Sequence, residues 1–159
     1  MKSIRIIAVG KLKTPFRALL EEYLKRPGFS AKIEIIEIEE QFLPEKPGNA
    51  DVKKALDTEG VLILKKLPKN SFAAALCIEG KQLSSERLAA LITEKEERTQ
   101  GGIIFIIGSS YGLSENVKTA ANLKLSLSEM TFPHQFARIM LTEQLYRAYC
   151  IKENIKYHK

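Results

Sequence analysis

The chain has 159 residues, of which 45% are hydrophobic and 28% are charged, and its formal net charge is +6. These values are typical of one soluble globular domain spanning residues 1–159, and no apolar run is long enough for a membrane span or a signal peptide. We therefore expect a cytoplasmic protein with no membrane partner. The excess of Lys and Arg suits a polyanion such as nucleic acid but does not by itself require one.

Predicted strands and helices alternate through the first half of the chain. The apolar run Ile4–Gly10 predicts a buried strand, and the helix that follows from Thr14 ends before residues 27–28, Pro-Gly. Alternating apolar and charged residues over Ala31–Glu40 predict a half-exposed strand. A loop with several Pro and Gly residues then leads to a predicted helix over Ala50–Lys66, where apolar residues recur at helical spacing.

The second half continues the alternation. Predicted strands lie in residues 71–80, 101–112 with a glycine-bounded turn, and 123–128; predicted helices run from 84 or 85 to 98, from 114 onward, and from 133 to about 153. This order is typical of an α/β fold with a largely parallel sheet. Because ligands bind beyond the carboxyl ends of such strands, the candidate segments are "CIEGK" (77–81), "GSSYGLS" (108–114) and "SLSEMTF" (126–132).

The glycines in these segments have two explanations. Gly108 and Gly112 bound a tight turn, and Gly80 follows the neighbouring strand, as in plain strand–helix connections. Glycine also lets a ligand approach the backbone closely, and two such loops at neighbouring strand ends form a better pocket candidate than either alone. The third Gly of a dinucleotide fingerprint and the Lys of a P-loop are missing, so nucleotide phosphate binding is poorly supported.

The cysteines and histidines are too few and too far apart to form a metal site. Cys77 and Cys150 both lie among apolar residues, and we expect two reduced thiols rather than a disulfide. With only two histidines, His134 and His158, and these two distant cysteines, the sequence predicts no metal. No nucleophile elbow or Cys–His pair accompanies His134, and its simplest role is structural.

The predicted last helix is apolar on more than one side. Leu141 and Leu145 lie on one side, and Ile139 and Tyr146 lie on another. In a domain of this size, such a helix is expected to face both its own core and a second subunit.

The chain ends in "YHK", residues Tyr157 to Lys159. A polar, basic end is usually a frayed terminus. A ring, an imidazole and a positive charge together also suit an RNA base with its phosphates. From the residues alone both explanations remain open.

Three stretches together resemble a known family. "FIIGSSYGLS", "LSLSEMTFPHQFARIMLTEQLYRAY" and the terminal "YHK" are similar to the small SPOUT-class methyltransferases, which methylate N3 of a pseudouridine in 23S ribosomal RNA. The resemblance extends from "IRIIAVGKLK" to the last residue. The chain departs from the family pattern at Ser109, where a second Gly usually follows Gly108.

The resemblance implies a fold, a cofactor and partners. It implies a parallel α/β sheet with a C-terminal trefoil knot, S-adenosylmethionine as cofactor, no metal, and a homodimer that acts on 23S rRNA, in the helix 69 loop of the ribosome. By position, the cofactor contacts would be Leu76, Gly108, Leu127, Ser128, Glu129, Met130, Thr131 and Phe132. The RNA contacts would be Arg138, Tyr157, His158 and Lys159, with His158 and Arg138 as the catalytic candidates.

The residue types suit this chemistry. A sulfonium methyl donor needs no metal, and the enzyme mainly aligns donor and acceptor. The acceptor nitrogen must lose a proton, which a His can accept and which a nearby Arg makes easier by lowering the pKa of the nitrogen. Two alternatives stay open: a SPOUT methyltransferase for another RNA such as tRNA, and a non-catalytic RNA-binding protein.

Overall fold

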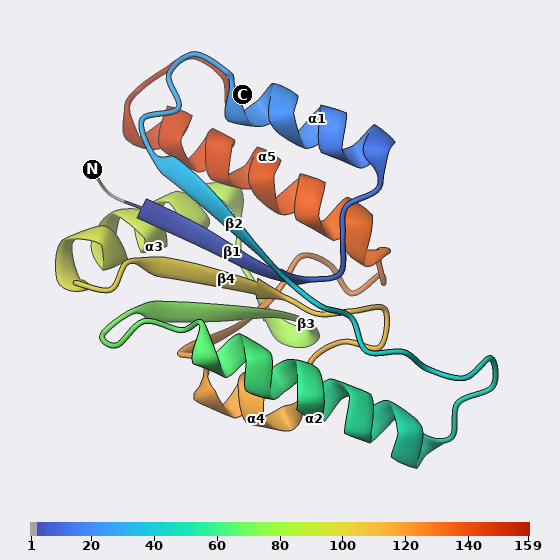
Figure 1. Ribbon diagram of the computed structural model, residues 1–159. Coiled ribbons are helices and arrows are strands. Elements are labelled where there is room, and N and C mark those ends of the chain that lie inside the picture. Colours follow the sequence, from blue (N-terminus) through green and yellow to red (C-terminus); the bar gives the residue numbers. More distant parts are fainter. Residues whose placement is uncertain (1–2) are drawn as a thin grey trace.

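The computed structural model describes residues 3–159, in which strands and helices alternate along the chain (Figure 1). The elements are β1 (Ser3–Val9), α1 (Thr14–Leu24), β2 (Lys32–Ile38), α2 (Asn49–Lys65), β3 (Phe72–Gln82), α3 (Ser85–Arg98), β4 (Ile103–Ile107), α4 (Glu115–Ala120), β5 (Leu123–Ser126) and α5 (His134–Lys152). The predicted order of elements is confirmed, with bounds that differ by a few residues.

The strands form one five-stranded sheet in the order β2-β1-β4-β3-β5, and every pairing is parallel. The central strand β4 has the sequence IIFII and all its residues are buried, as expected for a strand covered on both faces. The edge strand β2 alternates half-buried and exposed residues along most of its length. Its charged residues therefore lie where the sequence predicted them.

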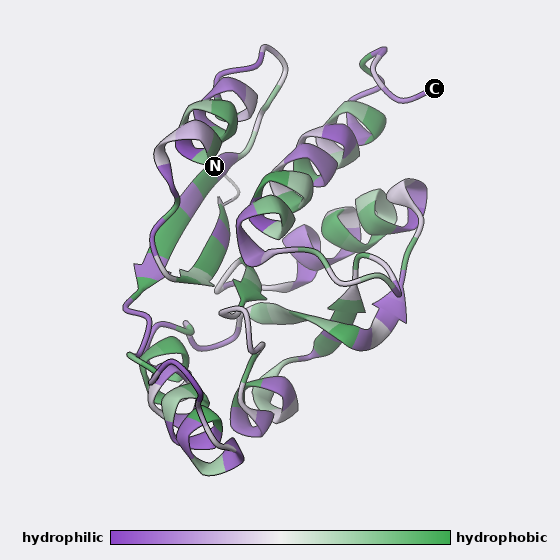
Figure 2. Ribbon diagram, turned by 90° about the vertical axis from the view of Figure 1, so that its right-hand side faces the viewer, coloured by the Kyte–Doolittle hydropathy of each residue, from purple (hydrophilic) through white to green (hydrophobic). Residues whose placement is uncertain are grey.

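Helices cover both faces of the sheet (Figures 1 and 2). Helices α3 and α5 pack on one face over a core that includes Ile6, Phe105 and Leu141, and α1 lies beside α5. Helices α2 and α4 pack on the opposite face over a second core that includes Ile63 and Val117. This arrangement leaves the carboxyl ends of the strands free for a site.

The two apolar sides of α5 are both used within the chain. Leu141 and Leu145 are fully buried in the core shared by the sheet and α3. Ile139 packs on another side against Leu12 and against Leu20 of α1. The two-sided pattern therefore reflects the packing of α5 between the sheet, α3 and α1, and it does not by itself indicate a second subunit.

The fifth strand is shorter than the alternating sequence predicted, because a local turn removes the chain from the sheet. The Ser126 hydroxyl donates to the Ser128 carbonyl at 2.9 Å, and the Ser128 hydroxyl accepts from the Met130 amide at 3.0 Å. Residues 127–133 then connect the edge strand β5 to α5, which packs against α1 and α3. This connection forms one wall of the site described next.

Candidate active site

A cavity of about 630 Å³ lies beyond the carboxyl ends of the sheet, between the segments that follow from β3, β4 and β5. Its size is that of a pocket for a small molecule or cofactor. The lining comes from residues 76–79, 107–113, 125–128 and 130–134, with Lys118 and Ala137. The three segments that the sequence singled out therefore meet at one place, as the topology of a parallel sheet predicts.

Strand β3 contributes to the cavity through a bulge. Leu76 and Lys81 both align with Leu125 of β5, so the residues between them have no partners on that strand. Cys77, Ile78 and Glu79 lie in this bulge and line the cavity. A bulge of this kind redirects side chains out of the regular alternation of a strand.

The turn after β4 depends on the absence of a side chain at Gly108. A Cβ atom there would overlap the carbonyl group of Gly112 and approach Leu113 to 3.0 Å. Gly112 itself has φ +89°, a conformation that favours glycine, and a Cβ on it would meet nothing within 4 Å. Ser109 bridges to Gly112 within the turn, so the Ser that replaces the usual second glycine is accommodated.

Seven of the eight residues expected to contact a cofactor line the cavity. These are Leu76, Gly108, Leu127, Ser128, Met130, Thr131 and Phe132. Glu129 is exposed and is not part of the lining. Met130 is 74% exposed and Tyr111 is 50% exposed, so two large apolar side chains stand at the rim with little protein covering them.

A thiol and an ion pair line the wall formed by β3 and α4, and of these the sequence analysis missed the ion pair. The Lys118 ammonium contacts Glu79 at 2.6 Å and holds the pKa of that carboxyl group below its usual range. Burial raises the pKa of the neighbouring Cys77 thiol, so this thiol is a poor nucleophile. Cys150 is buried elsewhere, and both cysteines are free, as expected.

A buried carboxyl group lies close to the glycine turn. Glu59 of α2 is 3% exposed, its Oε2 accepts from the Gln41 amide at 2.9 Å, and its Oε1 has no hydrogen-bond partner within residues 3–159. Burial raises the pKa of this carboxyl group; the Gln41 amide and the neighbouring Ser109 hydroxyl act in the opposite direction, and the charge of Glu40 adds to the rise. Glu59 therefore sits directly behind the turn that forms one wall of the cavity.

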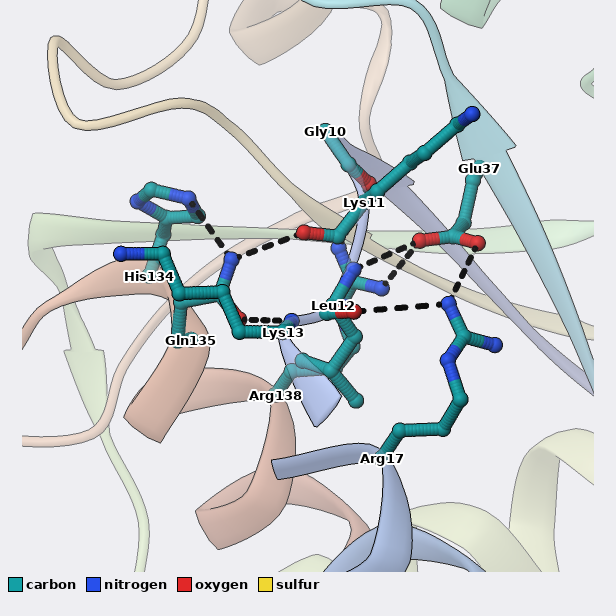
Figure 3. A network of polar contacts seen from close by, with 9 residues as sticks. All are labelled: Gly10, Lys11, Leu12, Lys13, Arg17, Glu37, His134, Gln135 and Arg138. Atoms are coloured by element: carbon teal, nitrogen blue, oxygen red, sulfur yellow. Dashed lines mark hydrogen bonds and ion pairs between the residues drawn. The ribbon is translucent and has the colours of Figure 1, made fainter. Parts of the chain in front are cut away.

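Arg138 lies in a buried polar network beside the cavity, not on the surface (Figure 3). Its side chain is 1% exposed, Nη1 donates to Glu37 at 3.0 Å, and Nη2 donates to the Gly10 carbonyl at 3.0 Å. Nε has no hydrogen-bond partner among the described residues. The expected contact between Arg138 and RNA is therefore not available on the surface of the single chain.

Glu37 is the centre of this network. Its carboxyl group accepts from Arg138 and from the Leu12 amide, and Arg17 lies 3.5 Å away. Burial by itself raises the pKa of Glu37, but these donors and positive charges outweigh it and hold the pKa below its usual range. The sequence analysis made no separate prediction for Glu37, and its partner lies 101 residues away, so no local pattern signals this contact.

The C-terminal tail is packed against α5 and the segment after α1, and it is not frayed. The Tyr157 hydroxyl accepts from Arg26 at 3.1 Å and donates to Glu143 at 3.1 Å, and its ring lies 4.8 Å from that of Tyr146. Glu143 also forms an ion pair with Arg147, at 2.6 Å. The tail thus has a defined position in the chain.

The tail residues lie away from the cavity. His158 contacts Glu86 at 2.7 Å and Arg147 at 3.2 Å, and none of residues 157–159 lines the cavity. His134 does line it, at the first residue of α5, and Arg147 lies 13 residues further along, about 20 Å at the rise of an α-helix. Figure 2 shows the C-terminus beyond the far end of α5. The structure therefore does not bring the expected cofactor and RNA residues together within one chain.

Across residues 3–159 there is no group of three or more His, Cys, Asp or Glu side chains arranged to hold a metal ion. Over the same range, no helix combines the length and the apolar character needed to cross a membrane.

Comparisons with known proteins place the chain in a family. It is 45% identical to the ribosomal RNA large subunit methyltransferase H of Oenococcus oeni, with 100% of both chains covered. It is 43% identical to the protein of the same name from Clostridioides difficile, with 99% of both covered.

Solved structures share the fold at low sequence identity. A probable methyltransferase from Bordetella pertussis has a TM-score of 0.58 at 14% identity, covering 93% of this chain and 96% of that one. A probable methylase family protein from Haemophilus influenzae has a TM-score of 0.58 at 11% identity, covering 98% and 70%. The family model described as "Predicted SPOUT methyltransferase" matches residues 1–158. The chain belongs to the SPOUT methyltransferase family.

Proposed function

We propose that this protein transfers a methyl group from S-adenosylmethionine to N3 of a pseudouridine in the helix 69 loop of 23S ribosomal RNA, in the cytoplasm. The observation that carries the proposal is the convergence of seven expected cofactor residues on one cavity. The similarity of the whole chain to ribosomal RNA large subunit methyltransferases supports RNA as the acceptor. The assembled ribosome is the proposed substrate.

The cavity suits the proposed cofactor. A volume of about 630 Å³ accommodates a nucleoside with an amino-acid arm, and the wall around Leu76 and Leu125 is apolar. The Gly108 turn leaves a surface without a side chain, where a ligand can lie against the backbone. We propose that backbone groups of the segment 127–132 hydrogen-bond the base of the cofactor. The bound cofactor supplies an electrophilic methyl group and needs no metal.

His158 is the better supported of the two catalytic candidates. Its side chain is 26% exposed, so the imidazole can exchange its contact with Glu86 for a contact with substrate. Arg138 is enclosed by Glu37 and Gly10, and a direct role for it would require this network to open. We propose that His158 handles the proton of the acceptor nitrogen and that Tyr157 stacks on a base.

We propose a homodimer in which the tail of one subunit completes the site of the other. The distance between the tail and the cavity within one chain supports this, because a tail that acts there must come from a second copy. The outer surface of α1 and α5 carries Leu19 at 41% exposure and Phe136 at 51%, and the Phe136 ring packs on Phe16. These apolar side chains support a subunit contact on this surface.

We also propose that the C-terminal segment forms the trefoil knot of the family. The segment 127–133 leaves the edge strand β5, passes the ends of β3 and β4 where it lines the cavity, and enters α5 beside α1 and α3. Single-molecule stretching from the two termini tests the proposal. A knotted chain unfolds to a contour shorter than that of the fully extended chain, and a full-length contour would exclude the knot.

The function is tested with ribosomes from cells that lack this protein. Incubation with the purified protein and labelled S-adenosylmethionine should place one methyl group on a modified uridine of 23S rRNA, located by mass spectrometry of nuclease fragments. Label in tRNA instead would favour a different RNA substrate. Ribosome binding without methyl transfer would identify a non-catalytic binding protein.

A further inference from the structure

The loop that joins β1 to α1, residues 10–13, is fixed by side chains from the first two turns of α5 (Figure 3). Gln135 Nε2 donates to the Lys11 carbonyl at 2.9 Å, and Gln135 Oε1 accepts from the Lys13 amide at 2.9 Å. Arg138 fixes the Gly10 carbonyl, and Glu37 accepts from the Leu12 amide. Every residue of this loop therefore has a backbone group held by a buried or half-buried side chain.

The side chains that this fixed loop presents are cationic. Lys11 and Lys13 are exposed, and neither forms an ion pair with any of residues 3–159. Arg17 follows one turn into α1 with half of its side chain exposed, and it contacts Glu37 at 3.5 Å. These hydrogen bonds satisfy polar groups of the loop backbone, and they also fix the points from which the two lysine side chains extend. The two positive charges are therefore presented from a backbone of defined position.

The acidic groups nearby do not cancel these charges. Glu37 is already neutralised by the buried Arg138. Glu40 has its carboxyl group 3.2 Å from the place where a Cβ of Gly10 would lie, and it makes no ion pair with either lysine. The surface of the loop therefore keeps a positive potential that attracts anions.

The loop lies beside the mouth of the cavity. Gln135 is adjacent to His134 and its Nε2 lies 3.4 Å from the His134 imidazole, which lines the cavity. The position of a Gly10 Cβ is 4.0 Å from the same imidazole. A nucleotide whose base reaches the cavity would thus have its backbone within range of the loop.

We propose that Lys11 and Lys13 form a clamp for the phosphate groups of the RNA strand next to the target nucleotide, and that Gln135 and Arg138 act as positioning residues for this clamp. The proposal rests on the proposed function and adds a substrate contact to it. Lysine binds phosphate as a point charge, and contacts to phosphate position an RNA without reading its sequence. A prearranged backbone lowers the entropy lost when the strand binds.

The test compares two double variants of equal charge. The variant K11Q/K13Q removes the clamp, and the control K66Q/K69Q removes two exposed lysines near the opposite, amino-terminal edge of the sheet. Affinity for ribosomes is measured by sedimentation over a series of salt concentrations, and methyl transfer is measured at saturating ribosome concentration. Calorimetry with S-adenosylmethionine serves as a separate check of the cavity.

The clamp predicts that K11Q/K13Q binds ribosomes about tenfold more weakly and that the slope of log K against log salt falls by about one per lysine. Its KM for ribosomes should rise while kcat and cofactor affinity stay unchanged. The variant Q135L should show the same rise in KM, to a smaller extent, with kcat and cofactor affinity again unchanged. An unchanged salt slope, or an equal change in K66Q/K69Q, would overturn the clamp. Because this result is a binding measurement, it is independent of whether the wild-type protein methylates the ribosome, which tests the proposed function itself.

Discussion

Arg138 and Glu37 form a contact of 3.0 Å between the last helix and an edge strand, and the arginine is almost completely buried. The pair therefore joins β2 and the loop after β1 to the amino-terminal end of α5, directly beside the cavity. A buried arginine depends on its partner, because an unpaired charge in the interior is costly. The stability of this end of the molecule should respond to the protonation of Glu37.

Replacement of Glu37 by Gln should destabilise the protein at pH 7, by about 2 kcal/mol, because Arg138 loses its counter-charge. The pKa of Glu37 is lower in the folded chain than in the unfolded one, so its stabilisation is present above the unfolded pKa and is lost as the pH falls through the folded pKa. Urea unfolding should show the difference between wild type and E37Q shrinking below about pH 4.5. A difference that is constant from pH 7 to pH 3 would contradict the assignment.

The pH dependence of stability that Glu59 contributes should have the opposite sign to that of Glu37. Its pKa is raised by burial, so the folded state prefers the neutral form and stability falls as the pH rises from the unfolded pKa through the folded one. The variant E59Q keeps an oxygen for the Gln41 amide and removes the charge, so it should be more stable than wild type at pH 7, by roughly 1 kcal/mol. The gain should vanish near pH 4, and the exposed Glu45, changed to Gln, serves as the control. Destabilisation by E59Q at pH 7 would refute this account.

Local sequence patterns predicted the elements and the place of the site. The apolar run of β4, the capping serines Ser84 and Ser114, and the glycines of the strand ends all act locally, so their positions could be inferred without a structure. The packing of the tail on Tyr146 and the pairing of Arg138 with Glu37 join segments distant in sequence, and neither leaves a local signal. The two apolar sides of α5 were visible in the sequence, but the partner on the second side, α1, was not.

Gly108 and Gly112 allow a matched test of the cavity. A Cβ at Gly108 overlaps the Gly112 carbonyl group, so G108A must distort the turn that lines the cavity. A Cβ at Gly112 meets nothing within 4 Å, and G112A should cost only the strain of a positive φ, about 1 kcal/mol. Calorimetry should show that G108A loses affinity for S-adenosylmethionine at least tenfold while G112A retains most of it. Equal affinities would indicate that the cofactor does not lie against the Gly108 turn.

A deletion of the tail cannot test its catalytic role alone, because its residues pack within their own chain and are also proposed to act in the site of the other subunit. Removal of residues 157–159 deletes the contacts of Tyr157 with Arg26 and Glu143, so some loss of stability is expected for purely structural reasons. The single variant H158A leaves those contacts in place. It should lower kcat about a hundredfold through loss of a proton-handling group, with little change in ribosome binding or thermal stability.

Mixed dimers show whether the tail completes the cavity of its own subunit or that of the partner. H158A has an intact cavity and a defective tail, whereas G108A has a defective cavity and an intact tail. If the tail completes the cavity of the partner, each mixed dimer contains one complete site, formed by the cavity of the H158A subunit and the tail of the G108A subunit. Random exchange makes half of the dimers mixed. At a cofactor concentration that saturates the wild-type cavity but not that of G108A, an equal mixture should therefore recover about a quarter of wild-type activity although each variant alone is nearly inactive. If the tail acts on its own cavity, no dimer has a complete site, and mixing the two inactive proteins would restore nothing.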